Sequence, residues 1–290
     1  MSEPPRIALA TCAPLPEGDG DEAALPAALG PSVAADFVPW DDPAADWARY
    51  DLVVVRATWN YQAQREAYLG WARALGDRVL NPAPVLTWNT DKRHLDELAG
   101  AGLPVVPTRF VAPGEPFVAP TGAYVVKPTV SAGSRDTARF VTGEHERAAA
   151  LVAAIHGGGR TAMVQPYVAS VDARGETAMV FFDGRFSHAI HKGPLLRPGA
   201  APSSEVFVPE TIEPRAASPA ELAVAERVTA WAARRFDGPL LYARVDLVTD
   251  AAGAPLVLEL ELTEPSLFLT QADGAVQRFA AAILARVPKR

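Results

Sequence analysis

Residues 242–262 read YARVDLVTDAAGAPLVLELEL, and this stretch decides the fold. Alternating residues on either side of Asp-Ala-Ala-Gly predict a β-hairpin with strands over 241–249 and 256–262. Alternate side chains of a strand share one face, so Arg244 lies beside Asp246 and, on the second strand, Glu259 lies beside Glu261. A turn centred near Ala252 then places Asp246 opposite Glu259. The same register places Arg244 opposite Glu261.

The second strand carries leucine on the reverse of its acidic face, at Leu258, Leu260 and Leu262. Opposed carboxylates repel, and removing each ion from water costs several kcal/mol, so they need a compensating cation. Oxygen ligands completed by water and phosphate are what Mg²⁺ prefers. We therefore interpret Asp246, Glu259 and Glu261 as magnesium ligands. The alternative is a solvent-exposed acidic face that forms salt bridges with Arg244.

Lysine is scarce, because the 27 basic residues comprise 23 Arg and four Lys. Arginine fills most positions that need only a surface charge, so the remaining lysines are candidates for a site. Lysine is a compact point charge suited to single phosphate oxygens. Lys92, Lys127 and Lys192 lie in patterned segments, whereas Lys289 is next to last and is expected to be solvated.

Lys127 closes an apolar strand and precedes a loop of small residues, Thr-Val-Ser-Ala-Gly-Ser-Arg-Asp-Thr over 129–137. The hydroxyls and backbone N–H groups of such a loop, with Ser131, Gly133 and Ser134, can cover a triphosphate. The alternative is a polar hairpin loop whose lysine extends to solvent.

Weaker signals surround this segment. Residues 89–92, Asn-Thr-Asp-Lys, are typical of a capped helix start. Residues 163–168 carry a strand into Pro166, where freed backbone amides near Gln165, Tyr167 and Val168 can meet an adenine edge; a domain hinge is the alternative. Glu176 opens the next strand, and Lys192 ends its partner.

The sequence lacks the residue patterns of a zinc site and of covalent nucleophilic catalysis. His188 and His191 have opposite parity on one strand, so they cannot bind one metal together. The sequence has no H-E-x-x-H and no G-x-S-x-G, and Cys12 has no assignable partner. Zinc and covalent nucleophilic catalysis are therefore not expected.

The first 88 residues alternate strands with helices, which predicts a parallel sheet. Strands are expected over 7–11, 36–40 and 52–55, with helices over 21–29 and 62–75. Neither G-x-G-x-x-G nor G-x-x-x-x-G-K-[ST] occurs, so two common phosphate-binding loops are absent.

The remaining chain is expected to mix helices and strands. A helix over 91–99, capped by Asn89 or Thr90, buries Leu95 and Leu98. Further helices are expected over 144–155, 219–236 and 275–286, and strands over 105–108, 123–127, 138–141, 162–165, 177–182 and 186–191. Residues 193–204 are too long and polar for a tight turn, so they form a lid or a slack loop.

Composition narrows the function further. The chain has 290 residues, enough for two or three domains, with a net charge of −7 and scattered bases, which disfavours nucleic acid as a partner. No apolar run is long enough to span a membrane. One cysteine excludes an intrachain disulfide, and the start lacks a signal-peptide core, so a cytoplasmic location is expected.

Taken in order, these segments resemble the ATP-grasp superfamily of carboxylate ligases in its glutathione-synthetase-like branch. The resemblance covers residues 89–286 and implies an α/β ATP-grasp fold after a Rossmann-like N-terminal domain. The expected division is 1–88 for the substrate domain, 89–165 for the small lobe and 166–290 for the large lobe with the metal site.

The resemblance also implies roles for the candidate residues, with ATP and Mg²⁺, or alternatively Mn²⁺, as cofactors. Lys92 and Lys127 face phosphates, Lys192 reaches the terminal phosphates, and residues 131–137 form a flap. Gln165, Tyr167 and Val168 form an adenine hinge, and Glu176 binds ribose. Arg244 steadies phosphate and acyl-phosphate oxygens. The family usually has Glu-x-Asn where this chain has Glu259-Leu-Glu261, which keeps an oxygen ligand and adds a charge.

The mechanism that the resemblance implies is electrostatic. The γ-phosphoryl group passes to a substrate carboxylate, and an amine-type nucleophile attacks the acyl phosphate. No protein nucleophile is required.

Short N-terminal segments are similar to a small bacterial group of D-cycloserine-forming cyclo-ligases, which close the ring of O-ureido-D-serine. They include Val-Val-Arg-Ala-Thr-Trp-Asn-Tyr over 54–61 and Trp-Asn-Thr-Asp-Lys over 88–92. Arg56, Thr58 and Trp59 are the expected substrate contacts; a surface arginine in a loop is the alternative for Arg56. The substrate is then a small amino-acid-like carboxylate, and a homodimer is compatible with this class. A ligase that joins amino acids or peptides and a nucleotide-binding regulator without turnover are the competing functions.

Overall fold

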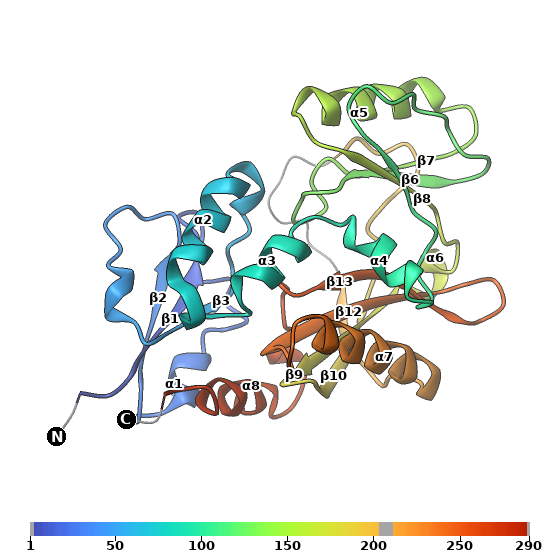
Figure 1. The fold of residues 1–290 in the computed structure, drawn as a ribbon. Helices are drawn as coiled ribbons and strands as arrows, with labels where there is room; N and C mark the ends of the chain where they lie inside the picture. Colours follow the sequence, from blue (N-terminus) through green and yellow to red (C-terminus); the bar gives the residue numbers. More distant parts are fainter. Residues whose placement is uncertain (1–2, 203–210, 289–290) are drawn as a thin grey trace.

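The structure is a computed structural model that describes residues 3–202 and 211–288. Three sheets make up the described fold, and the chain passes through them almost in sequence order (Figure 1). None of the described helices is both long and apolar enough to span a membrane.

The first sheet is parallel, in the order β2-β1-β3-β4, as the alternation of strands and helices predicts. Its strands are β1 (Arg6–Thr11), β2 (Ala34–Pro39), β3 (Leu52–Val55) and β4 (Val79–Leu80). The expected second helix is α2 (Arg65–Leu75), preceded by the 3₁₀ turn η2 (Tyr61–Ala63). The expected helix over 21–29 is shorter: α1 (Leu25–Leu29) begins just before Pro26, a residue that favours a helix start over a helix interior.

The second sheet is antiparallel, in the order β5-β8-β6-β7, and α5 (His145–Gly157) packs on it. Its strands are β5 (Arg109–Val111), β6 (Tyr124–Pro128), β7 (Ala138–Phe140) and β8 (Ala162–Pro166). The expected strand over 105–108 is wrong. Only an isolated bridge from Val105 to Val257 forms there, because Pro104 and Pro107 lack the N–H groups that a ladder needs.

Two helices connect the first two sheets, and one of them was not expected from the sequence. The unexpected helix α3 (Ala83–Asn89) is followed by α4 (His94–Gly100), which buries Leu95 and Leu98 as predicted. Neither Asn89 nor Thr90 caps α4. The Asn89 amide instead donates to Leu260 O (2.8 Å), and its oxygen accepts from Leu262 N (2.7 Å).

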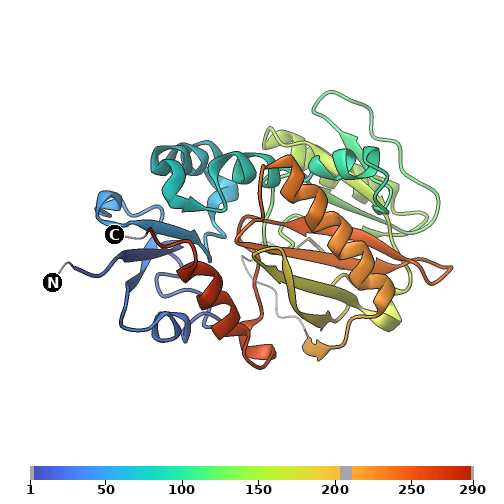
Figure 2. The same cartoon turned by 60° about the horizontal axis from the view of Figure 1, so that its bottom comes forward.

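The third sheet is antiparallel, in the order β11-β10-β9-β12-β13, and contains the hairpin that opened the sequence analysis. Its strands are β9 (Glu176–Phe182), β10 (Arg185–Lys192), β11 (Ile212–Arg215), β12 (Tyr242–Thr249) and β13 (Pro255–Glu261). The long orange helix in Figure 2 is α7 (Pro219–Arg235), which begins with a capping box at Ser218 and lies across one face. The short helix α6 (Val171–Arg174) precedes β9. The expected loop over 193–204 has no helix or strand up to residue 202, and its remainder lies outside the described residues.

The predicted register of the hairpin is confirmed: Asp246 pairs with Glu259 and Arg244 with Glu261. A β-bulge follows at once, because Leu247 pairs with Val257 and leaves Leu258 as an extra residue. The bulge corrects one expectation. Val257, not Leu258, joins Leu260 and Leu262 in the core under α7, and Leu258 turns to the opposite side, where it lines a cavity.

The last helix, α8 (Ala275–Leu284), returns to the first sheet, beside α1 in Figure 1. Its Phe279 and Ile283 share one apolar cluster with Ile7 and Leu9 of β1 and with Phe182 of β9. The last helix of the chain therefore packs against the N-terminal sheet. The division at residues 88 and 165 remains a prediction.

Candidate active site

A cavity of about 240 Å³ lies where the sheets meet. All the candidate residues except Arg56 and Thr58 line it. They are Trp59, Lys92, Lys127, Ser131, Gly133, Ser134, Gln165, Tyr167, Val168, Glu176, Lys192, Arg244, Asp246, Glu259 and Glu261. Segments separated by up to about 200 positions along the chain thus converge on one space.

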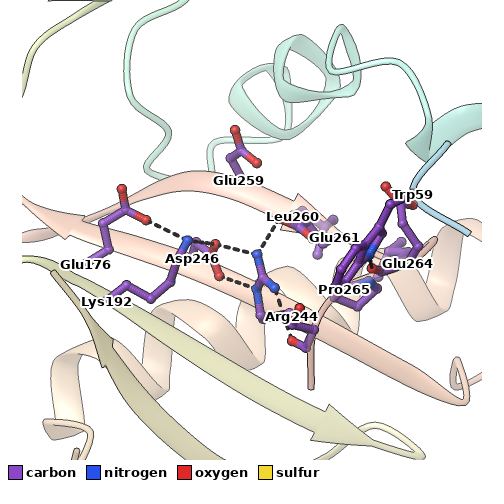
Figure 3. Close-up of polar contacts among 12 residues, drawn as sticks. Trp59, Glu176, Lys192, Arg244, Asp246, Glu259, Leu260, Glu261, Glu264 and Pro265 are labelled. Atoms are coloured by element: carbon purple, nitrogen blue, oxygen red, sulfur yellow. Dashed lines mark hydrogen bonds and ion pairs between the residues drawn. The ribbon is translucent and has the colours of Figure 1, made fainter. Parts of the chain in front are cut away.

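Ion pairs connect the basic and acidic groups of this cavity (Figure 3). Arg244 forms a two-point contact with Asp246, at 2.8 Å from Nε to Oδ1 and 3.0 Å from Nη2 to Oδ2, and also pairs with Glu261. Lys192 Nζ lies 3.1 Å from both Glu176 Oε2 and Asp246 Oδ2. The acidic strands therefore face the cavity, which contradicts the alternative of a solvent-exposed acidic face.

Lys127 and Lys92 close the cavity from the second sheet and from the turn before α4. Lys127 pairs with Glu259 across the cavity. The Nζ of Lys92 donates to Ser131 O (3.1 Å), so this lysine lies against the small-residue loop. Gly133, Ser134 and Asp136 of that loop have positive φ angles, and the loop lies outside the β6–β7 ladder.

Burial and charge act in opposite directions on the acids. Burial opposes ionisation of Glu259, but the nearby lysines, Lys127 first, outweigh it and hold the pKa of Glu259 well below its usual range. Burial is likewise outweighed at Asp246 by Arg244 and Lys192, and its pKa is lowered. Burial and the neighbouring acids raise the pKa of Glu261. At neutral pH, Asp246 and Glu259 are therefore carboxylates.

The three predicted metal ligands present only oxygen atoms, which suits Mg²⁺. Within residues 3–202 and 211–288, however, no three His, Cys, Asp or Glu side chains converge with metal-binding geometry. Arg244, Lys127 and Lys192 occupy the carboxylate oxygens instead. The donor chemistry thus fits the metal, and the ion pairs show that cations approach the acids from the cavity.

Part of the cavity wall is apolar, where Val125, Val168, Val171, Val248 and Leu258 line it. The guanidinium carbon of Arg139 lies 3.5 Å from the centre of the Tyr167 ring, which fixes that ring, and Tyr167 N donates to Ala123 O. Gln165 donates to Thr108 (2.9 Å). The bulge lets Leu258 join Tyr167, Val168, Val171 and Val248 in one apolar cluster, which we call the apolar slot.

Comparison with known proteins places this chain. Residues 7–81 match the family described as D-cycloserine synthetase DcsG, N-terminal domain. The cycloserine biosynthesis protein DcsG of Streptomyces lavendulae is 38% identical over 272 residues, which cover 88% of this chain and 89% of DcsG. The chain belongs to the D-cycloserine synthetase family. A crystal structure of D-cycloserine synthetase DcsG aligns with 98% of this chain and 100% of its own, with a TM-score of 0.89 and 36% identity.

More distant structures share the fold of this family. D-alanine–D-alanine ligase from Bacillus anthracis, complexed with ATP, aligns with 97% of the chain at a TM-score of 0.66 and 14% identity. A RimK domain ATP-grasp protein from Sphaerobacter thermophilus aligns with 96% at 0.65 and 18% identity. The fold is therefore the expected α/β ATP-grasp fold, and the family member described here is an ATP-dependent ligase.

Two residues expected to contact substrate in this family member do not line the cavity. Arg56 is 1% exposed; its Nε lies 2.6 Å from Glu22 Oε1, and its Nη2 donates to Pro265 O (2.7 Å). Thr58 is buried against the Tyr68 hydroxyl (3.3 Å). The surface-loop alternative is therefore wrong for Arg56, because strand β3 ends inside the molecule and not at its surface; a contact of Arg56 with substrate stays a prediction.

Arg56 is instead one of several side chains that fix the loop after β13. Every backbone carbonyl from Leu262 to Leu267 accepts a hydrogen bond from a side chain, at 2.7–3.1 Å. The donors, in order, are Asn81, Tyr242, Trp59, Arg56, Arg244 and His188. We call residues 262–267 the anchored loop. It brings Glu264 and Ser266 to the cavity wall.

Sequence reasoning missed several lining residues, among them Tyr61, His94, Glu264 and Phe268. The oxygen-rich segment Thr-Glu-Pro-Ser after the hairpin was the available signal for Glu264. Tyr61 and Phe268 carry no local signal, because only the packing of the first sheet against the third brings them together.

Proposed function

We propose that the cavity binds Mg²⁺-ATP and transfers the γ-phosphoryl group to the carboxylate of a small amino acid. One observation carries the proposal: three lysines, one arginine and four ion-paired acids surround a single cavity whose wall includes the apolar slot. Lys92, Lys127, Lys192 and Arg244 would neutralise charge on the transferred group. Asp246, Glu259 and Glu261 would hold Mg²⁺, which neutralises the phosphates when bound.

The remaining assignments concern the nucleoside. Tyr167, Val168 and Gln165 would border the adenine, with Leu258 and Val248 packing on the base. Glu176 would bind the ribose after releasing Lys192, with which it pairs now. Ser131, Gly133 and Ser134 would cover the phosphates from the side of Lys92.

We propose ring closure of O-ureido-D-serine to D-cycloserine as the reaction, in line with the name of the relative. In the acyl phosphate, the nitrogen bonded to the side-chain oxygen attacks the carbonyl carbon, and phosphate leaves. Ring closure leaves the carbamoyl group on the ring nitrogen. One water molecule then cleaves that group, which leaves as carbamic acid, and D-cycloserine remains. Joining two amino acids is the competing reaction.

A screen of small amino acids tests this proposal. We expect phosphate release from ATP to depend on an added D-configured, O-substituted serine, and mass spectrometry to find the cyclic product. A product whose mass is that of two joined amino acids would favour intermolecular ligation. Phosphate release that ignores every amino acid would favour a nucleotide-binding regulator.

Mg²⁺-ADP should raise the melting temperature of the protein. A ligand that binds only the folded state stabilises it by about 2.7 kcal/mol at 100 times its Kd. Differential scanning fluorimetry with ADP, with and without Mg²⁺, measures the shift. Equal melting temperatures at saturating Mg²⁺-ADP and in buffer would contradict the nucleotide site.

We also propose that Mn²⁺ can take the place of Mg²⁺ and that two copies of the protein associate. The proposed location is the cytoplasm, and nucleic acid is not a proposed partner. Phosphate release in Mn²⁺ and size-exclusion chromatography at several concentrations check the metal and the dimer.

A further inference from the structure

Glu264 differs from the other acids of the cavity. Glu176, Asp246, Glu259 and Glu261 each pair with a lysine or arginine. For Glu264, no ion pair forms with any basic residue in the described part of the chain, and its side-chain partner is the Tyr61 hydroxyl. A half-buried carboxyl group in the cavity wall thus forms no ion pair within the described residues, although the charges of Lys92 and Arg244 act on it from a distance.

The position of Glu264 is fixed by its backbone. It lies in the anchored loop, where its own carbonyl accepts from Trp59 Nε1 at 2.9 Å. The next two carbonyls, of Pro265 and Ser266, accept from Arg56 and Arg244. Tyr61, which contacts the carboxyl group, is itself 2% exposed. The carboxyl group is therefore presented on a rigid element, as a binding site requires.

Glu264 lies far along the cavity wall from Glu176, the residue proposed to bind the ribose (Figure 3). In Figure 3, Glu176 and Glu264 mark opposite ends of the row of side chains, and Arg244 and Asp246 lie between them. A substrate carboxylate must come close to Arg244 to receive a phosphoryl group. In an amino acid, the ammonium group is one carbon away from that carboxylate, so it reaches the wall next to Arg244 and the anchored loop.

We propose that Glu264 binds the α-ammonium group of the amino-acid substrate and that Tyr61 orients its carboxylate; this inference rests on the proposed function. The protein supplies cations for phosphates and for the substrate carboxylate, and Glu264 supplies the one counter-charge that a zwitterion still needs. Charge-assisted hydrogen bonds of this kind are short and strong in a buried site.

Without a bound ammonium ion, the Glu264 carboxyl group is mostly protonated near neutral pH. Burial and the charge of Glu261 raise the pKa of Glu264 to about 8, although Lys92, Tyr61 and Arg244 act in the opposite direction. A bound ammonium ion would favour the ionised form and relieve this desolvation.

The experiment compares two substrates in two proteins. O-ureido-D-serine is measured against its desamino analogue, 3-(ureidooxy)propanoate, with the unaltered protein and with Glu264→Gln, by ADP release at saturating Mg²⁺-ATP. We expect the unaltered protein to prefer the amino acid by 30-fold or more in kcat/KM. We expect Glu264→Gln to lose most of this preference because its KM for the amino acid rises. Its KM for ATP should change less than 2-fold. Tyr61→Phe should weaken the preference by a smaller factor.

Controls separate the alternatives. Glu66→Gln, at an exposed position of α2, should behave like the unaltered protein. Thermal stabilisation by Mg²⁺-ADP shows that Glu264→Gln is folded. If Glu264→Gln still prefers the amino acid to its desamino analogue, the inference is overturned and the proposed function stands. The same conclusion follows if the only change in Glu264→Gln is a higher requirement for Mg²⁺. If the unaltered protein turns over no amino acid at all, the proposed function and this inference fall together.

Discussion

Lys127→Ala should weaken the binding of Mg²⁺-ATP about 30- to 100-fold. A hydrogen bond between charged groups contributes about 2–3 kcal/mol, and Lys127 is the basic group that the second sheet brings to Glu259 and the phosphate region. Isothermal titration calorimetry with a non-hydrolysable ATP analogue measures the change. The variant also leaves Glu259 without its lysine, so its unfolding must be recorded in parallel.

The matched control is Arg185→Ala, which removes a positive charge from an exposed position of β10. It should leave the Kd for nucleotide within 2-fold. If Lys127→Ala folds normally and titrates like the control, Lys127 does not contact nucleotide and the phosphate assignment fails for this residue.

Arg56→Ala should lower the free energy of unfolding by about 3–5 kcal/mol, because removal of one partner leaves a buried charge uncompensated. Glu22 loses its ion pair, Pro265 O loses a donor, and the guanidinium no longer packs over the rings of Tyr242 and Phe279, at 5.0 and 5.4 Å. Urea denaturation measures the loss. Arg73→Ala, at an exposed position of α2, should change stability by less than about 0.5 kcal/mol.

The pH dependence identifies Glu22 as part of the cause. Burial raises the pKa of Glu22 to about 7 even though Arg56 lowers it, so the folded state holds a proton that the unfolded state releases near pH 4.5. Stability from this group is therefore present at low pH and is lost as pH rises to about 7. Without Arg56 the folded pKa is higher, so the variant should continue to lose up to about 1.4 kcal/mol per pH unit above pH 7. Adding Glu22→Gln should remove this slope, and a slope that persists would contradict the assignment.

Most of the hairpin could be predicted, apart from the bulge at Leu258, because its information is largely local. Strand periodicity indicates the faces, and the predicted pairing of Asp246 with Glu259 is confirmed. Beside the turn, however, Leu247 pairs with Val257, so this pairing also depends on the bulge at Leu258, which shifts the register by one residue. The scarcity of lysine also directed attention to Lys92, Lys127 and Lys192, all of which line the cavity. Neither signal depends on contacts between distant segments.

The expectations that the structure overturns depend on contacts between segments far apart in the sequence. The bulge that turns Leu258 into the cavity is set by the fit of β13 against α7 and β12, which the periodicity of one strand does not contain. A surface loop was one reading of Arg56 because the residue follows a strand, yet Arg56 is buried against Glu22 and Pro265, which lie 34 and 209 positions away. Asn89 looked like a helix cap and instead binds the backbone of β13 and the residue after it.

The return of α8 to the first sheet limits how this enzyme can be re-engineered. A chimera that takes only the first eighty residues from a relative with another substrate would pair a foreign sheet with a helix selected for a different surface, at Phe279 and Ile283. The same graft would separate Trp59 and Arg56 from the carbonyls that they hold. Exchanging specificity therefore calls for transplanting both ends of the polypeptide as one unit, with the middle of the chain left in place.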